Sequence, residues 1–261
     1  MIRAAFVLGA GLGTRLRPLT EHCPKPLVPV NGRPLITYAF DHLGAAGVER
    51  FVVNTHHCPE AYEAVLGTPS TPSISRFSEN SGSALFAVHD RLGYWRDLPI
   101  IFRHEPILLD TGGGIANIAD LFAEEESFFI HNGDVLADLD LSALAAVHTR
   151  DANAVTLALR SHGGPLQVSC ADGRVLDIRG TLGNLDAPRY LFTGIYIASP
   201  VVFRYVDSSH PNSIIPALLH MITDGLRIGG VVLDAGIWHD IGTLASYAAI
   251  NDNFPHLSYT Q

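Results

Sequence analysis

The residues from Gly9 to Arg15 (GAGLGTR) combine three glycines at alternate positions with a cation. Glycines spaced in this way let the backbone turn sharply and direct successive N–H groups at an anion. Arg15 adds a permanent charge with a forked donor geometry that suits phosphate oxygens. Without Arg15, a tight turn between a strand and a helix would explain the glycines equally well. With it, the segment predicts a phosphate cradle.

Two other kinds of glycine loop are excluded by the residues themselves. A Walker loop needs GxxxxGK[ST], and the sequence contains none. A dinucleotide fingerprint needs GxGxxG, but Thr14 and Leu16 stand where the third glycine would be. A dehydrogenase with a dinucleotide site is therefore disfavoured.

Lys25 is the second residue type that points to anion chemistry. It is the only lysine among seventeen basic residues, and it lies between Pro24 and Pro26. The two prolines restrict the backbone on either side of it. A chain that uses arginine at every other basic position keeps one compact, strongly hydrated ammonium here, which indicates a functional role.

These motifs resemble a known family. GAGLGTRLRPLT followed by PKPLVPVNGRPLI is similar to the signature of the nucleoside-diphosphate-sugar pyrophosphorylases, also called sugar-1-phosphate nucleotidyltransferases. Looser matches follow in HEPILLDTGGGI, HNGDVLAD, FTGIYI and WHDIGT, so the resemblance covers essentially the whole chain. The nearest motif types are the N-acetylmuramic acid-1-phosphate uridylyltransferases and the mannose-1-phosphate guanylyltransferases.

The resemblance implies roles for individual residues. Arg15, Lys25, Asp134 and Asp240 would be catalytic, with Asp134 and Asp240 as ligands of Mg²⁺. The nucleotide would be bound by Leu8, Gly9, Ala10, Gly11, Gly13, Thr14, Glu105, Thr111 and Gly112, with Glu105 and the second glycine run facing the base and ribose. The sugar would be bound by Asn132, Gly194 and Arg179. Without the resemblance, an aspartate after a strand is more often a turn former or helix cap.

One stretch departs from the family pattern. Many members carry a Glu-Lys-Pro sequence whose lysine reaches the sugar phosphate, whereas this chain has VLDIRG at the comparable place. Arg179 is one candidate to replace that lysine. The alternative is that this section binds a different sugar in a different way.

The implied reaction is the transfer of a nucleoside monophosphate from a nucleoside triphosphate to a sugar-1-phosphate, with release of pyrophosphate. UTP with an amino-sugar or muramic acid phosphate, and GTP with mannose-1-phosphate, both remain open. A catalytically silent subunit of the same fold that senses sugar nucleotides is the alternative function, because a fold alone does not fix an activity.

The elements that must position these residues follow from hydrophobic patterning. Strands are expected at 3–8, 50–55, 99–104, 127–134 and 154–160, and helices from Pro34 to Gly47 and at 59–67, 114–122 and 141–150. Such alternation predicts an α/β fold of the Rossmann-like, doubly wound kind, with a mostly parallel mixed sheet, helices on both faces and ligands at the carboxyl ends of the strands. We expect one domain over 1–261, an inserted loop at 68–90 and a small β-rich substrate-facing section at 161–198.

Composition excludes several other classes. Hydrophobic residues make up 47% of the 261 residues, and the net charge is −9, which argues against a nucleic-acid partner or an anionic membrane surface. No apolar stretch approaches a membrane span, and no signal peptide is recognised. The three cysteines form no CxxC pair, and the histidines have no metal-site spacing. We therefore expect a cytoplasmic protein with no second activity, and we leave a homodimer open.

Overall fold

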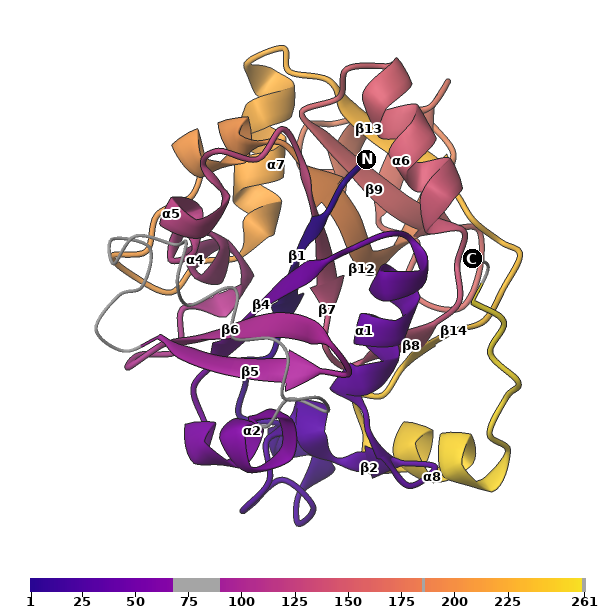
Figure 1. Ribbon diagram of the computed structural model, residues 1–261. Helices are drawn as coiled ribbons and strands as arrows, with labels where there is room; N and C mark the ends of the chain where they lie inside the picture. Colours follow the sequence, from indigo (N-terminus) through magenta and orange to yellow (C-terminus); the bar gives the residue numbers. More distant parts are fainter. Residues whose placement is uncertain (68–89, 185, 260–261) are drawn as a thin grey trace.

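The computed structural model describes residues 1–67, 90–184 and 186–259, and it is built around one twisted sheet (Figure 1). The strands of this sheet, in spatial order, are β10 (Val168–Ala171), β11 (Arg174–Ile178), β13 (Ile228–Val232), β9 (Val155–Arg160), β12 (Arg189–Ala198), β7 (Phe128–Asn132), β1 (Ala4–Leu8), β4 (Arg50–Thr55), β6 (Leu98–His104) and β5 (Arg91–Trp95). Two short ladders join β2 (Pro29–Val30) to β3 (Arg33–Pro34) and β8 (Val135–Ala137) to β14 (Trp238–Asp240).

The sheet is mixed, as expected, but parallel pairing is confined to two groups of strands. Strands β7, β1, β4 and β6 run parallel to one another, and β13 runs parallel to β9. The β12 strand is antiparallel to both β7 and β9, and the outer strands β5, β10 and β11 also pair antiparallel. The sheet is thus less parallel than the alternation predicted, because the β-rich section extends it instead of forming a separate layer.

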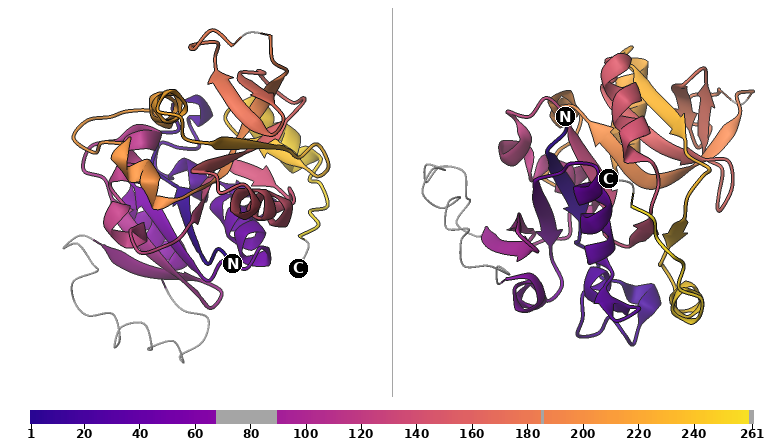
Figure 2. Two further views of the ribbon diagram at one scale, coloured as in Figure 1. Left: turned by 90° about the horizontal axis from the view of Figure 1, so that it is seen from above. Right: turned by 45° about the vertical axis from the view of Figure 1, so that its right-hand side comes forward.

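Helices cover both faces of the sheet (Figures 1 and 2). Helices α4 (Asp110–Ala116), α5 (Ala119–Phe122) and α7 (Ile214–Thr223) pack on one face, and α1 (Ile36–Ala45), α2 (Pro59–Leu66) and α6 (Leu141–Arg150) pack on the other. The β1 strand serves both cores by alternation, since Phe6 joins the first cluster and Val7 the second. Helix α8 (Leu244–Asp252) closes a third, smaller cluster.

Local patterning predicted the central elements well. The strand at 50–55 and the helix at 141–150 have the bounds that were expected. The helix expected at 114–122 instead starts at Asp110 and divides into α4 and α5. Strands β2, β3, β5, β8, β13 and β14 were not predicted. The expected insertion at 68–90 lies outside the described residues except for Asp90. In the described ranges, no helix is long and apolar enough to cross a membrane.

Candidate functional site

Two neighbouring cavities lie at the carboxyl ends of β1, β4 and β7. The first, of about 400 Å³, is called the glycine-loop cavity because residues 8–15 form one wall of it. The second, of about 870 Å³, is called the β12 cavity because residues 191–194 and Tyr196 line it. Asp110, Thr111 and Asn132 line both. The two cavities therefore meet along a shared edge.

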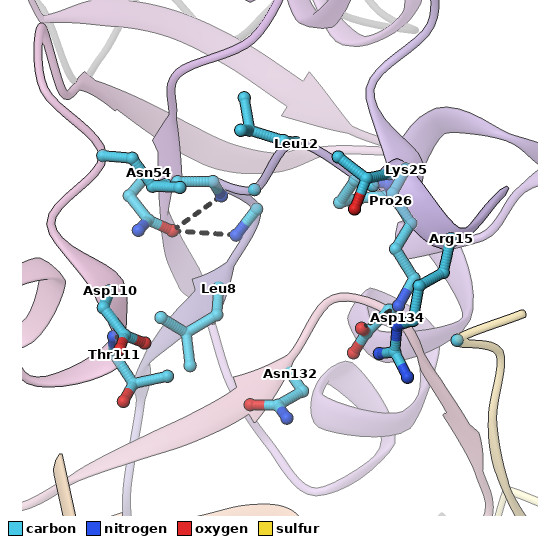
Figure 3. Close-up of a pocket in the computed structure, with 17 residues that line it drawn as sticks. Leu8, Leu12, Arg15, Lys25, Pro26, Asn54, Asp110, Thr111, Asn132 and Asp134 are labelled. Carbon is cyan, nitrogen blue, oxygen red and sulfur yellow. Dashed lines mark hydrogen bonds and ion pairs between the residues drawn. The ribbon is translucent and has the colours of Figure 1, made fainter. Parts of the chain in front are cut away.

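The amides of the glycine loop do not all face the cavity. Gly9 N and Ala10 N donate to Asn54 Oδ1 at 2.8 and 3.3 Å, as Figure 3 shows. The amides of residues 11–14 have no acceptor among the described residues, and these residues line the cavity. Within the loop, the amides from Gly11 to Thr14 are therefore the ones left to form the predicted phosphate cradle. Gly9 and Ala10 line the cavity, but their amides donate to Asn54, so their part in binding the nucleotide stays a prediction.

Gly13 is the point at which the loop requires glycine. Its φ is +58°, and a Cβ atom there would lie 2.9 Å from Thr20 Cγ2 and 3.1 Å from Lys25 Cβ. Thr20 Oγ1 also donates to Gly13 O at 2.7 Å. This close approach packs the loop against the segment that carries Lys25. Arg15 and Lys25 therefore line the same cavity.

Lys25 begins a 3₁₀ turn, Lys25–Leu27, directly after Pro24. Its ammonium forms an ion pair with Asp134 Oδ2, and only 13% of the lysine side chain and 28% of the aspartate side chain are exposed. Figure 3 shows Arg15, Lys25 and Asp134 together at one end of the glycine-loop cavity. Arg15 has no carboxylate within ion-pair distance in the described chain. Its guanidinium is free to contact a ligand anion.

Asp240 is brought beside Asp134 by the short β8–β14 ladder. Asp240 pairs with Val135, and Ile241 N donates to Asp134 O at 3.1 Å. Burial and the neighbouring Asp134 carboxylate raise the pKa of Asp240, while Lys25 and Arg15 act in the opposite direction. Asp134 lines the glycine-loop cavity and Asp240 lines the β12 cavity. The two carboxylates therefore stand on either side of the boundary between the cavities.

This pair of carboxylates fits a Mg²⁺ ion. Mutual repulsion already disfavours the charged form of Asp240, and a divalent cation between the two would relieve it. Among the described residues, no group of three or more His, Cys, Asp and Glu side chains is placed to hold a metal. Mg²⁺ is commonly held by one or two carboxylates with substrate phosphates and water completing the shell, so two are sufficient.

Three of the residues predicted to bind the sugar lie on the β12 cavity. Gly194 has φ +78°, and a Cβ atom there would lie 2.5 Å from Asn132 Nδ2, so glycine is what allows the amide of Asn132 to occupy this place. Arg179 is exposed, and its Nε donates to Gln167 Oε1 at 3.0 Å. Aromatic side chains of Phe192 and Trp238 also line this cavity.

Two predicted nucleotide ligands do not reach the cavities. Glu105 is fully buried, and its carboxylate accepts from Asn54 Nδ2 at 2.8 Å and from Leu109 N at 3.0 Å. Gly112 is buried too, and its amide donates to Asn212 O. The expectation that Glu105 and Gly112 face the base is therefore corrected. Thr111 does line both cavities, and its hydroxyl accepts from Ile214 N.

Sequence reasoning missed Asn54 and Asp110. Asn54 is the penultimate residue of β4, where a buried amide is unusual enough to have drawn attention. Asp110 adopts φ +60°, a strained value for a residue with a side chain, and it lines both cavities. No pattern of residue types in the sequence predicts the positive φ of Asp110, so only the structure reveals it.

Comparison with known proteins identifies the family of this chain. The model of the nucleotidyl transferase family matches residues 4–256. The chain therefore belongs to the nucleotidyl transferase family, and the resemblance seen in its motifs is confirmed at that level.

Particular proteins are similar to this chain. A mannose-1-phosphate guanylyltransferase of Mycobacterium tuberculosis is 33% identical over 92% of this chain, although the match spans only 61% of the relative's own length. An N-acetylmuramate alpha-1-phosphate uridylyltransferase of Caulobacter vibrioides is 32% identical, and 92% of each chain is covered. A solved UDP-glucose pyrophosphorylase of Acinetobacter baumanii superposes with a TM-score of 0.74 over 98% of this chain and 96% of its own, at 19% identity, which supports the fold alone.

Proposed function

We propose that the protein transfers a nucleoside monophosphate from a nucleoside triphosphate to a sugar-1-phosphate, giving a nucleoside-diphosphate sugar and pyrophosphate. The observation that carries this proposal is the convergence of Lys25, Asp134, Asp240 and Arg15 where two cavities meet. The glycine-loop cavity would hold the triphosphate and the β12 cavity the sugar. Family membership and the named activities of both relatives support the same reaction.

The reaction requires the protein to position the two substrates and to neutralise their negative charge, and it requires no proton transfer. A phosphate oxygen of the sugar-1-phosphate is already an anionic nucleophile, and it attacks the α-phosphorus while the bond to the departing pyrophosphate breaks in line. Two substrates that repel each other must be held together, and negative charge must be neutralised as the reaction proceeds. In this proposal Arg15 contacts the triphosphate, and Lys25 contacts the α-phosphate or the sugar phosphate.

Mg²⁺ is part of the proposal. Asp134 and Asp240 would hold the ion, which when bound would neutralise phosphate charge at the boundary between the cavities. Lys25 would then share Asp134 with the metal and keep that carboxylate oriented. The backbone amides from Gly11 to Thr14 would bind phosphate oxygens, and Asn132 would bind the sugar beside Gly194.

Two substrate pairs are supported by the relatives' names: GTP with mannose-1-phosphate, and UTP with N-acetylmuramate-1-phosphate. The test is a panel of four nucleoside triphosphates against hexose, hexosamine and muramic acid phosphates, with Mg²⁺ and a pyrophosphate assay. We expect release with one of these two pairs. Silence across the panel, accompanied by binding of a sugar nucleotide, would instead indicate the sensing subunit.

A further inference from the structure

We propose that Glu105 and Asn54 form a buried clamp that fixes the two walls of the glycine-loop cavity relative to each other. Both are positioning residues, because they act on the cavity through other groups. The inference rests on the proposed function for its kinetic consequences. It replaces the base-binding role that the sequence suggested for Glu105 with one that its burial allows.

The first half of the clamp holds the glycine loop. Asn54 is 1% exposed, and its Oδ1 accepts from the amides of both Gly9 and Ala10. The fully buried Tyr62 donates its hydroxyl to Gly9 O at 2.9 Å. The first residue of the loop is therefore bound through both its N–H and its C=O. These hydrogen bonds fix the orientation of the backbone at Gly9, and residues 11–14 that follow it line the cavity.

The second half of the clamp holds the opposite wall. Glu105 follows β6 directly, and its Oε2 accepts from Leu109 N at 3.0 Å. Leu109 N lies one residue before Asp110 and two before Thr111, and both of these line the cavity. Glu105 Oε1 accepts from Asn54 Nδ2 at 2.8 Å. One carboxylate thus joins the two walls through a single chain of hydrogen bonds.

The third glycine of the TGGGI run makes room for this pair. A Cβ atom on Gly114 would lie 3.0 Å from Asn54 Nδ2 and 3.0 Å from Glu105 Oε1. Gly9 is similarly confined, since a Cβ atom there would lie 2.7 Å from Asn54 O and 2.7 Å from Val53 Cγ1. Gly9 and Gly114 therefore lack a Cβ atom at places where Asn54 or Glu105 comes close to the backbone.

The polarity of the clamp is fixed by its partners. Both groups that face Glu105 are donors, so only a carboxylate accepts from both of them. Asn54 must accept from the loop with one atom and donate to Glu105 with the other. A buried donor left without an acceptor costs about 1–3 kcal/mol. A substitution that pairs donor with donor or acceptor with acceptor should therefore weaken the clamp.

This polarity gives a sharp test. Glu105→Gln places an amide nitrogen against one of two donors, and Asn54→Asp places two carboxylates against each other. The double variant Asn54→Asp/Glu105→Gln restores every pair. The new carboxylate at position 54 accepts from the loop and from the new amide at position 105, whose oxygen accepts from Leu109 N. The double variant also keeps the net charge.

Below the melting temperature of each variant, we expect the KM for the nucleoside triphosphate to rise at least about tenfold. The KM for the sugar phosphate should rise less, because Asp110 and Thr111 also line the β12 cavity. The double variant should recover most of this loss. A double variant no better than the worse single variant, or a single-variant defect that vanishes when the protein is assayed fully folded, would overturn the clamp.

Hydrogen–deuterium exchange tests the same inference without turnover. Peptides covering residues 9–13 and 106–111 should exchange faster together in each single variant and return to wild-type protection in the double variant. A peptide from β9 serves as the unaffected control. If the wild type turns over no triphosphate, the proposed function fails while the exchange result still decides on the clamp. Faster exchange in only one of the two peptides would contradict the proposal that Glu105 and Asn54 couple the two walls.

Discussion

Lys25 is the residue on which the charge arrangement of the site depends. It contacts Asp134, it lowers the pKa of Asp240 against the effects of burial and Asp134, and it lines the glycine-loop cavity. Its place between two prolines and behind Gly13 leaves its stem little choice of direction. A cation held in advance at the reacting phosphates lowers a barrier more than one that must be ordered during the reaction.

For Lys25→Ala we expect turnover to fall about 10²-fold or more, because a preorganised charge is removed from the transition state. Steady-state kinetics with saturating substrates measures this. Lys25→Arg is the matched control: it keeps the charge and spreads it over a larger planar group, so it should retain part of the activity. Near-normal turnover of the alanine variant would remove Lys25 from the reaction.

Asp240→Asn should weaken the dependence on Mg²⁺. The variant keeps the shape of the side chain and loses one of the two carboxylates, so the Mg²⁺ concentration for half-maximal rate should rise about tenfold or more. Asp110→Asn is the control, because Asp110 lines both cavities but lies at the opposite end of the glycine-loop cavity from Asp134 (Figure 3). Identical metal titrations for wild type and Asp240→Asn would argue against ligation by Asp240.

The residue types of the site could be predicted where the chain itself brings them together. Arg15 and Lys25 follow one strand within twenty residues, and both line the expected cavity. Glu105 was misassigned because a carboxylate beside a glycine run has the same sequence appearance whether it faces a ligand or the protein interior. Burial decides between the two, and burial depends on Asn54 from another strand.

At the scale of elements, the β8–β14 ladder is what completes the site. It pairs three residues of each strand and brings together Asp134 and Asp240, which are far apart in the sequence. Pairings of this kind have too few residues for a detectable alternation and no turn to connect them, so hydrophobic patterning did not predict them. The strand at 50–55 and the helix at 141–150 carry their own periodicity and were predicted with these bounds.

The register of β12 shifts between Phe192 and Tyr196, and a substitution of Gly194 within this stretch should affect mainly the sugar side. Gly194→Ala places a methyl group against the amide of Asn132, so we expect the KM for the sugar phosphate to rise about tenfold, with little change for the triphosphate. Gly32→Ala is the matched control, since Gly32 has φ +76° and an added Cβ would meet nothing within 4 Å. Equal effects of the two substitutions on the sugar KM would assign the defect to backbone strain alone.

Helix α6 contributes a buried histidine to stability. His148 contacts Ser127 Oγ and Thr156 Oγ1, and burial lowers its pKa to about 4. Because the unfolded chain binds this proton near pH 6.5, the stabilisation is complete above that pH and is lost as the pH falls toward 4. Urea unfolding between pH 7 and 5 should show this loss, at most about 1.4 kcal/mol per pH unit for one proton. His148→Gln should flatten the curve by that amount, and an unchanged slope would contradict the assignment.

At the scale of the whole molecule, one sheet supplies both halves of the site. The parallel strands β7, β1 and β4 end at the glycine-loop cavity, and the antiparallel β12 beside β7 forms a wall of the second cavity. The change from parallel to antiparallel pairing falls between β7 and β12, where Asn132 lines both cavities. This arrangement suits a reaction that joins two separately bound anions.

The most direct test of this account follows the α-phosphate. A triphosphate labelled with ³²P at the α position is incubated with the enzyme, Mg²⁺ and the matching sugar-1-phosphate. We predict that the label moves into a nucleoside-diphosphate sugar only when the sugar phosphate is present, with one pyrophosphate released per label transferred. Label that stays in the triphosphate, or that appears as free nucleoside monophosphate, would contradict a transfer reaction at the meeting point of the two cavities.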